Sequence, residues 1–171
     1  MHKDESQNRA IAAATSFTEL QKIALKDLGC LPDNAIGICD PISTNPPVPG
    51  EASKDMFTIF EKTTEVLIGA GYNVFDERPY LHKLNELKHE WFEQHRSGGH
   101  CLAIIDEFYK PLLETKKIGA LILLPEVLGS YVSYWEEDFA SRNHIKLFTL
   151  PNSWNAKYDL ALVSGLAVLK Q

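Results

Sequence analysis

The feature that most constrains the fold is the uninterrupted apolar segment Ile118–Leu124. A strand without polar positions cannot face water on either side, so it belongs in a parallel sheet that helices cover on both faces. Three further segments, at 35–39, 72–76 and 145–150, combine strand-forming residues with turn formers at their ends. The sequence therefore predicts four strands.

Helical periodicity fills the stretches between these strands. Ser16 and Glu19 have the spacing of a capping box, which predicts a helix that begins there and ends near Gly29. Further helices are predicted at 53–68, 81–96, 101–116, 128–143 and 159–170. Alternating strands and helices imply crossover connections of one hand. We therefore predict an α/β fold of the three-layer Rossmann or flavodoxin-like type, with a mostly parallel sheet of four to five strands and the order 2-1-3-4 for the four clear ones.

Length and composition limit the class of protein. The 171 residues fit one domain, which we place at 16–171 behind a flexible polar leader at 1–15. The net charge is −6 and there is no basic cluster, which argues against nucleic acid as a partner. The apolar run at 120–125 is far too short to cross a membrane, and no other apolar run of the sequence approaches the length of a membrane span. Because the three cysteines are widely spaced, we expect no disulfides and a cytoplasmic location.

The predicted C-terminal helix has an extensive apolar face. Its apolar residues are Leu160, Leu162, Val163, Leu166, Val168 and Leu169. Such a face can pack on the sheet or join two copies of the chain. The sequence leaves both a core helix and a homo-oligomer open.

Open α/β sheets bind ligands beyond the carboxyl ends of their strands. The residues that follow the predicted strands are Asp40, Pro41, Ile42, Ser43, Asp76, Glu77, Arg78, Pro125, Glu126, Ser130, Pro151, Asn152 and Ser153. They bring acids, a cation and hydroxyl groups to one edge of the sheet. We therefore expect a small-molecule site at this edge.

The usual motifs for cofactors and metals are missing. The chain has no G-x-G-x-x-G and no G-x-x-x-x-G-K-[ST], which argues against a dinucleotide cofactor and a P-loop. It also lacks the G-x-S-x-G nucleophile elbow. His82, Glu86 and His89 share one predicted helix, but no second helix offers matching ligands. We expect neither a cofactor nor a metal ion.

Three successive acids, beginning at Glu136, lie in the helix predicted after the third strand. At 100° per residue, Val132, Trp135 and Phe139 form an apolar face of that helix. Glu136 lies at the edge of this face, about 40° from Val132, whereas the next two acids point away. We expect Glu136 alone of the three to be withdrawn from water, although a boundary residue whose head group reaches solvent fits the same pattern.

This segment resembles the nucleoside 2-deoxyribosyltransferase-like families. Their pattern is a Ser that opens a helix, a Glu six positions later and an Ala four beyond it, which Ser130, Glu136 and Ala140 match. The residues at 40–43 stand where these families have a Gly-Pro and a substrate-binding loop. The segment 71–76 is similar to their second strand, so the likeness runs through most of the predicted sheet.

The resemblance implies cleavage or transfer at the N-glycosidic bond of a nucleoside or nucleoside monophosphate. Glu136 would be the nucleophile, Asp76 or Asp40 would orient the substrate, and Tyr131 would contact the sugar or the nucleophile. A Ser at the position of Ser130 is typical of the related nucleoside-monophosphate hydrolases. The substrate-binding residues implied are Asp40, Pro41, Ile42, Ser43, Arg78, Glu126, Ser130 and Ser133.

The chain departs from the family pattern at several positions. Val132 replaces a Gly that leaves room for the sugar, Lys117 stands near the place of a base-binding Asp, and Asp40 replaces a Gly. A non-catalytic nucleotide-binding or scaffold protein of the same fold is therefore an alternative. The segment 133–135 also resembles TIR-like NAD hydrolases, but Phe139 stands where those proteins carry the catalytic Glu.

Overall fold

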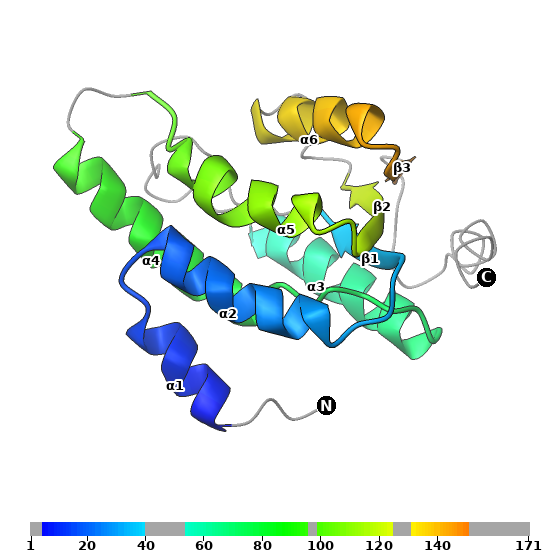
Figure 1. Ribbon diagram of the computed structural model, residues 1–171, viewed down its shortest axis with the longest axis horizontal. Coiled ribbons are helices and arrows are strands. Elements are labelled where there is room, and N and C mark those ends of the chain that lie inside the picture. Colours follow the sequence, from blue (N-terminus) through cyan, green and yellow to red (C-terminus); the bar gives the residue numbers. More distant parts are fainter. Residues whose placement is uncertain (1–4, 40–53, 96–98, 125–130, 151–171) are drawn as a thin grey trace.

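The computed structural model describes residues 5–39, 54–95, 99–124 and 131–150. The helices in these ranges are α1 (Glu5–Ala13), α2 (Phe17–Gly29), α3 (Lys54–Gly69), α4 (Arg78–Gln94), the π-helix η1 (Ile104–Tyr109), α5 (Lys110–Glu114) and α6 (Tyr131–Arg142). The strands are β1 (Ala35–Ile38), β2 (Ile118–Leu123) and β3 (Lys146–Thr149). Together they form a mixed α/β fold (Figure 1).

The three strands form one parallel sheet in the order β1-β2-β3. On the other side of β1, Val74 makes a single parallel bridge to Ile36. Two hydrogen bonds hold this bridge: Ile36 N donates to Asn73 O at 2.8 Å, and Phe75 N donates to Ile36 O at 2.9 Å. When the bridge is counted, the segment 72–76 lies beside β1, on the side opposite β2. Numbered along the chain as the four predicted strands, this is the predicted order 2-1-3-4.

The described residues contain three strands rather than the expected four to five. The predicted strand at 72–76 is reduced to the bridge at Val74. Gly71 turns the chain directly before this segment, with a φ of 83°, and α4 begins at Arg78 directly after it. The described segment between this turn and this helix, 72–77, pairs with β1 only at Val74.

The central strand β2 lies in the middle of the core. All of its residues except Gly119 are buried, as its apolar sequence predicts. In contrast, Lys146, Leu147 and Thr149 of the neighbouring β3 are exposed. Within the described residues, β3 is an edge strand that α6 covers on one side.

Helices pack on both sides of the strands. In Figure 1, α2 and α5 lie in front of the sheet, α3 lies behind it, and α6 runs beside β2 and β3. Helix α2 packs against η1, α4 and α5. The largest fully buried side chains are Tyr80, Phe60, Phe108, Leu20, Leu28, Ile36, Ile38, Leu67, Leu84, Ile104, Leu112 and Ile122. No helix in the described ranges is both long and apolar enough to cross a membrane.

The N-terminal segment differs from the flexible leader predicted for 1–15. Residues Glu5–Ala13 form α1, which packs on α2 and α4 and buries Ile11. Its Gln7 amide and the Tyr80 hydroxyl both donate hydrogen bonds to the Asp27 carboxylate. Burial and the bond to Asp27 raise the pKa of Tyr80, so its hydroxyl stays a donor. A largely polar helix can thus be held by one apolar residue and one buried hydrogen-bond network.

The capping box at the start of α2 is present in a shifted form. Ser16 Oγ accepts from Glu19 N at 3.2 Å, as predicted. The Glu19 carboxylate, however, accepts from Thr15 N at 2.8 Å and from the Thr15 hydroxyl at 2.9 Å. These bonds lower the pKa of Glu19 and close the turn between α1 and α2.

The helix predicted at 101–116 is divided into η1 and α5 around Pro111. Proline has no N–H group to donate and its ring presses on the preceding turn, so a regular helix is disturbed there. The wider π-helical turn of Ile104–Tyr109 precedes that point. The predicted C-terminal helix at 159–170 lies outside the described residues.

The close approach at Gly119 gives a test of the packing around β2. A Cβ atom at this position would lie 2.8 Å from Asn34 Oδ1 and 3.0 Å from Asn34 Cα. We therefore expect Gly119→Ala to lower the free energy of unfolding by about 1–3 kcal/mol, measured by urea denaturation. Gly29→Ala is the matched control, because no atom lies within 4 Å of its Cβ position. Equal stability of the two variants would contradict this packing.

Candidate functional site

The candidate site lies where the strands end. At this edge, Cys39 directly follows β1 and Leu124 directly follows β2. Asp76 and Arg78 follow the bridge residue Val74. Of the sequence-predicted site residues, the structure describes Asp76, Arg78, Tyr131 and Glu136. Those outside the described residues are Asp40, Pro41, Ile42, Ser43, Glu126 and Ser130. Ser133 belongs to α6, but its side chain is not among those described.

Glu136 is buried in α6, with 3% of its surface exposed. The next residue, Glu137, is only half-buried, and Asp138 is exposed. The expectation that Glu136 alone of the three acids is withdrawn from water is therefore confirmed. Its position is more central than predicted, because Val132, Glu136 and Ala140 form the buried stripe of α6.

The direction of α6 aims Glu136 toward the candidate site. The helix begins after β2 and returns toward the start of β3, so its N-terminus lies at the carboxyl edge of the sheet. Side chains of a helix tilt toward its N-terminus. Glu136 thus leans toward this edge from roughly one and a half turns inside the helix, and Val132, 2% exposed, lies one turn closer to the edge.

Asp76 and Arg78 form a tight pair at the same edge. Arg78 Nε donates to Asp76 Oδ1 and Arg78 Nη2 to Oδ2, both at 2.9 Å, and Arg78 N donates to Oδ1 at 3.1 Å. Glu65 lies 3.5 Å from Arg78 Nη1. The hydrogen bonds that Arg78 donates to Asp76 raise the pKa of Arg78. The structure therefore brings these two predicted site residues together, with Arg78 engaging both carboxylate oxygens of Asp76.

Tyr131 does not lie beside Glu136. The two residues are five positions apart on α6, which turns their side chains about 140° away from each other. Tyr131 is 46% exposed, and its ring stacks on that of His100 with centroids 4.9 Å apart. The predicted contact between Tyr131 and the nucleophile is thus not made, and Tyr131 instead joins α6 to the segment before η1.

Besides Glu136, the buried charged residues of the described chain are Glu77, Lys83 and Lys88. Glu77 was expected at the edge of the sheet, whereas the two lysines were not. Glu77 is 5% exposed at the start of α4, and Lys88 is 6% exposed further along that helix. A signal for Lys88 exists in the sequence, because it shares a helical stripe with Leu84 and Trp91. Burial of charge is costly unless the protein compensates it, and Glu77 and Lys88 both interact with other groups of the protein.

Lys88 lies near Cys101, which directly follows the stacked His100. Burial raises the pKa of the Cys101 thiol, and the positive charge of Lys88 partly opposes that rise. A fully buried thiol with a raised pKa is a poor nucleophile. Cys101 therefore acts as an apolar core residue.

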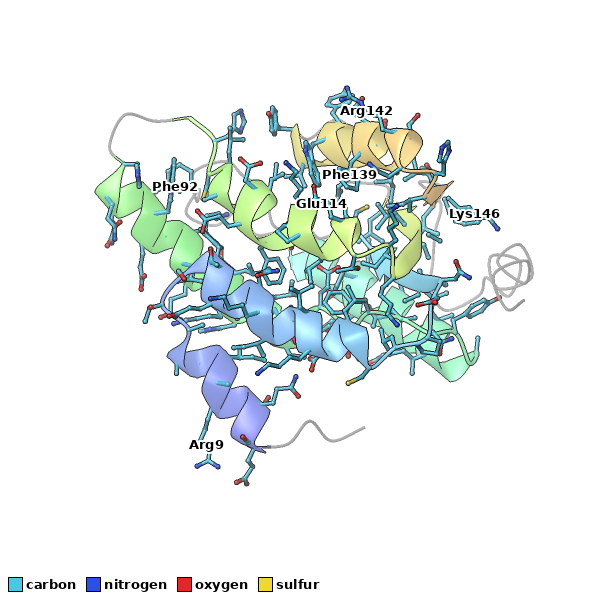
Figure 2. All side chains as sticks on the ribbon, in the orientation of Figure 1. Arg9, Phe92, Glu114, Phe139, Arg142 and Lys146 are labelled. Carbon is cyan, nitrogen blue, oxygen red and sulfur yellow. The ribbon has the colours of Figure 1, made fainter. Side chains whose placement is uncertain are left out.

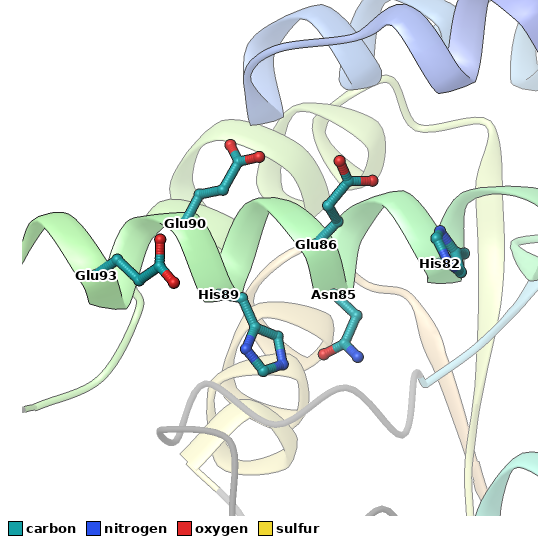
Figure 3. A pocket seen from close by; sticks show the side chains of 6 residues that line it. All are labelled: His82, Asn85, Glu86, His89, Glu90 and Glu93. Carbon is teal, nitrogen blue, oxygen red and sulfur yellow. The ribbon is translucent and has the colours of Figure 1, made fainter.

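A surface hollow of about 330 Å³ lies on α4 (Figure 3). Its lining residues are His82, Asn85, Glu86, His89, Glu90 and Glu93. All six come from one helix, and none belongs to the predicted site. In the described part of the chain, no three His, Cys, Asp or Glu side chains are grouped to hold a metal ion. The hollow is a solvated helix face rather than a candidate centre.

Comparisons with protein-family models, curated proteins and solved structures found no match for this chain. A functional assignment therefore depends on the residues of the site. Among the described residues, the strongest feature of the candidate site is the buried carboxylate of Glu136.

The Asp76–Arg78 pair can be tested by a double-mutant cycle. We expect Asp76→Asn and Arg78→Gln to be coupled by about 1 kcal/mol in urea unfolding, because the pair is bidentate but its side chains are 27% and 29% exposed. Glu65→Gln is the control partner, since Glu65 is 67% exposed and more distant. Coupling of Arg78 to Glu65 as strong as to Asp76 would contradict the observed geometry.

Proposed function

We propose that this protein cleaves or transfers the N-glycosidic bond of a nucleoside or nucleoside monophosphate, with Glu136 as the nucleophile. The observation that carries the proposal is the selective burial of Glu136 among three successive acids, on a helix that begins at the carboxyl edge of the sheet. A charged side chain in the middle of the buried stripe of α6 is costly for folding. A chemical role accounts for that cost.

The reaction suits a buried carboxylate. As the bond between C1′ and the base breaks, positive charge develops on the sugar, and an oxygen of Glu136 forms a bond to C1′. The base leaves with the bonding electrons and takes up a proton. Water or a second base then attacks C1′ and releases Glu136, which gives hydrolysis or transfer respectively. This scheme needs no cofactor.

The fold supports this placement. We further propose that the complete chain has the three-layer flavodoxin-like arrangement with four to five parallel strands, of which the described residues contain three. Ligands of such folds lie beyond the carboxyl ends of the strands, where α6 begins. In this scheme Asp76 positions the substrate indirectly, through Arg78, because Arg78 already engages both of its carboxylate oxygens.

A second function is favoured by Val132. Its side chain is 2% exposed and lies between Glu136 and the carboxyl edge, where a sugar would have to enter. A protein that binds a nucleotide at this edge without cleaving it would leave Glu136 enclosed in the same way. The two functions differ in turnover, which is measured directly.

Replacement of Glu136 is the direct test of catalysis. We expect Glu136→Gln to keep the fold, because the side chains are nearly isosteric, and to lose most of the turnover, on the order of 100-fold or more. Release of the free base from nucleosides and deoxynucleoside monophosphates would be followed by chromatography. Glu137→Gln, at the half-buried neighbouring position, is the matched control and should change the rate little.

Two results would count against this assignment. Equal rates for wild type and Glu136→Gln would exclude a nucleophilic role for Glu136. Binding of nucleotides by the wild type without any base release would favour the non-catalytic function.

Val132 gives a second test of access to Glu136. If its side chain narrows the entry, Val132→Ala should raise kcat/KM for bulky substrates by roughly 10-fold, since one or two methyl groups change discrimination by about 1–3 kcal/mol. The same change should lower the free energy of unfolding by about 1–3 kcal/mol, because it leaves space in the core. A stability loss without any change in substrate preference would place the entry elsewhere.

A further inference from the structure

The outward face of α6 exposes two large aromatic side chains. The exposed large hydrophobic residues among those described are Ile68, Leu102, Tyr131, Tyr134 and Leu147. Tyr131 and Tyr134 are three positions apart on α6 and are 46% and 64% exposed, so their rings share one helix face. The ring of His100, two residues before the exposed Leu102, stacks on Tyr131 at the margin of this face.

Along the same face, the exposed side chains change from aromatic near the N-terminus of α6 to charged near its C-terminus. Tyr131, Tyr134, Asp138 and Arg142 lie within about 80° of one another around the helix, opposite the buried stripe that contains Glu136. Asp138 and Arg142 form an ion pair at 2.9 Å, with 56% and 75% of their side chains exposed. Figure 2 shows Arg142 on the side of α6 turned away from the rest of the fold. One end of the stripe is therefore aromatic and the other is cationic.

We propose that this face binds a second copy of the chain, with the two α6 helices packed antiparallel. A two-fold axis near the middle of α6 would place Arg142 of each copy against Tyr131 of the other. Arginine over an aromatic ring is attracted by a cation–π interaction. The same operation places Asp138 next to Tyr134 of the partner copy, where the tyrosine hydroxyl can donate to the carboxylate.

The aromatic end and the cationic end of this face are complementary to each other, which favours a second copy of this chain as the partner. An interface around a two-fold axis uses the same patch twice, so each residue must find its complement on the same surface. The aromatic and cationic ends of α6 satisfy this condition only when the helices run in opposite directions. A parallel arrangement would place Arg142 against Arg142 and leave the aromatic ends without a cation.

The size of the face predicts a weak dimer. Helix α6 is about 18 Å long, and stable dimers bury roughly 800 Å² on each partner. The helix pair with His100 and Leu102 at its margin provides a compact contact with few anchors. Association should therefore depend on protein concentration.

The experiment is sedimentation velocity of the full chain over a dilution series. We expect the wild type to dimerise at high concentration and to dissociate on dilution. Tyr134→Glu and Arg142→Glu should each raise the dimer dissociation constant on the order of tenfold or more, while circular dichroism shows an unchanged fold. Ile68→Glu on α3 is the matched control, because Ile68 is similarly exposed at 44% and should leave dimerisation unchanged.

The outcomes separate this interface from others. Loss of dimer in both α6 variants, with the control intact, supports the antiparallel α6 contact. A wild type that is monomeric at every concentration overturns it. A dimer that resists both α6 variants overturns it as well, because the contact then lies on another surface. Dimerisation is read independently of base release, so failure of either proposal leaves the other testable.

Discussion

The structure depends on the burial of β2 between its two neighbours and the helices that cover it. Parallel strands place their carboxyl ends at one edge, and helices that connect them begin at that edge. The pairing of β2 with β1 and β3 therefore fixes where α6 starts. Helix α6 packs on β3, and β3 is held in the sheet by its pairing with β2.

Much of this arrangement can be predicted from the sequence, because it follows from local patterns. The apolar run at 118–124 specifies a strand buried on both faces, and the Ser16 cap specifies the start of α2. The parallel pairing of β1, β2 and β3 agrees with crossover connections between alternating strands and helices. The burial of Glu136 follows from helical periodicity, although the structure places it in the centre of the stripe instead of its edge.

The features that could not be predicted depend on contacts between distant segments. The segment 72–76 has a strand-like sequence, yet it pairs with β1 only through the single bridge at Val74. Helix α1 is mostly polar, and its position depends on Asp27 and Tyr80, far along the chain. The stacking of Tyr131 on His100 likewise joins two distant segments. The pairing of Asp76 with Arg78 is local, but it depends on side-chain directions that spacing alone does not determine.

The buried and the outward faces of α6 have different proposed roles. The inner side carries Val132, Glu136 and Ala140 against the sheet, while the outer side presents aromatic and charged groups to solvent. A dimer through the outer side would hold α6 rigidly, and a rigid helix favours accurate placement of a nucleophile. The two proposals are thus physically compatible, although they are tested separately.

The central claim is that Glu136 attacks the sugar, and the most direct measurement is capture of the covalent intermediate. The protein would be mixed with a deoxynucleoside monophosphate, quenched in acid within the first turnover and digested for peptide mass spectrometry. The account predicts that the peptide containing Glu136 gains the mass of the sugar phosphate, and that the Glu136→Gln variant gains none. Base release with the sugar attached to a different residue, or with unmodified protein at every quench time, would contradict it.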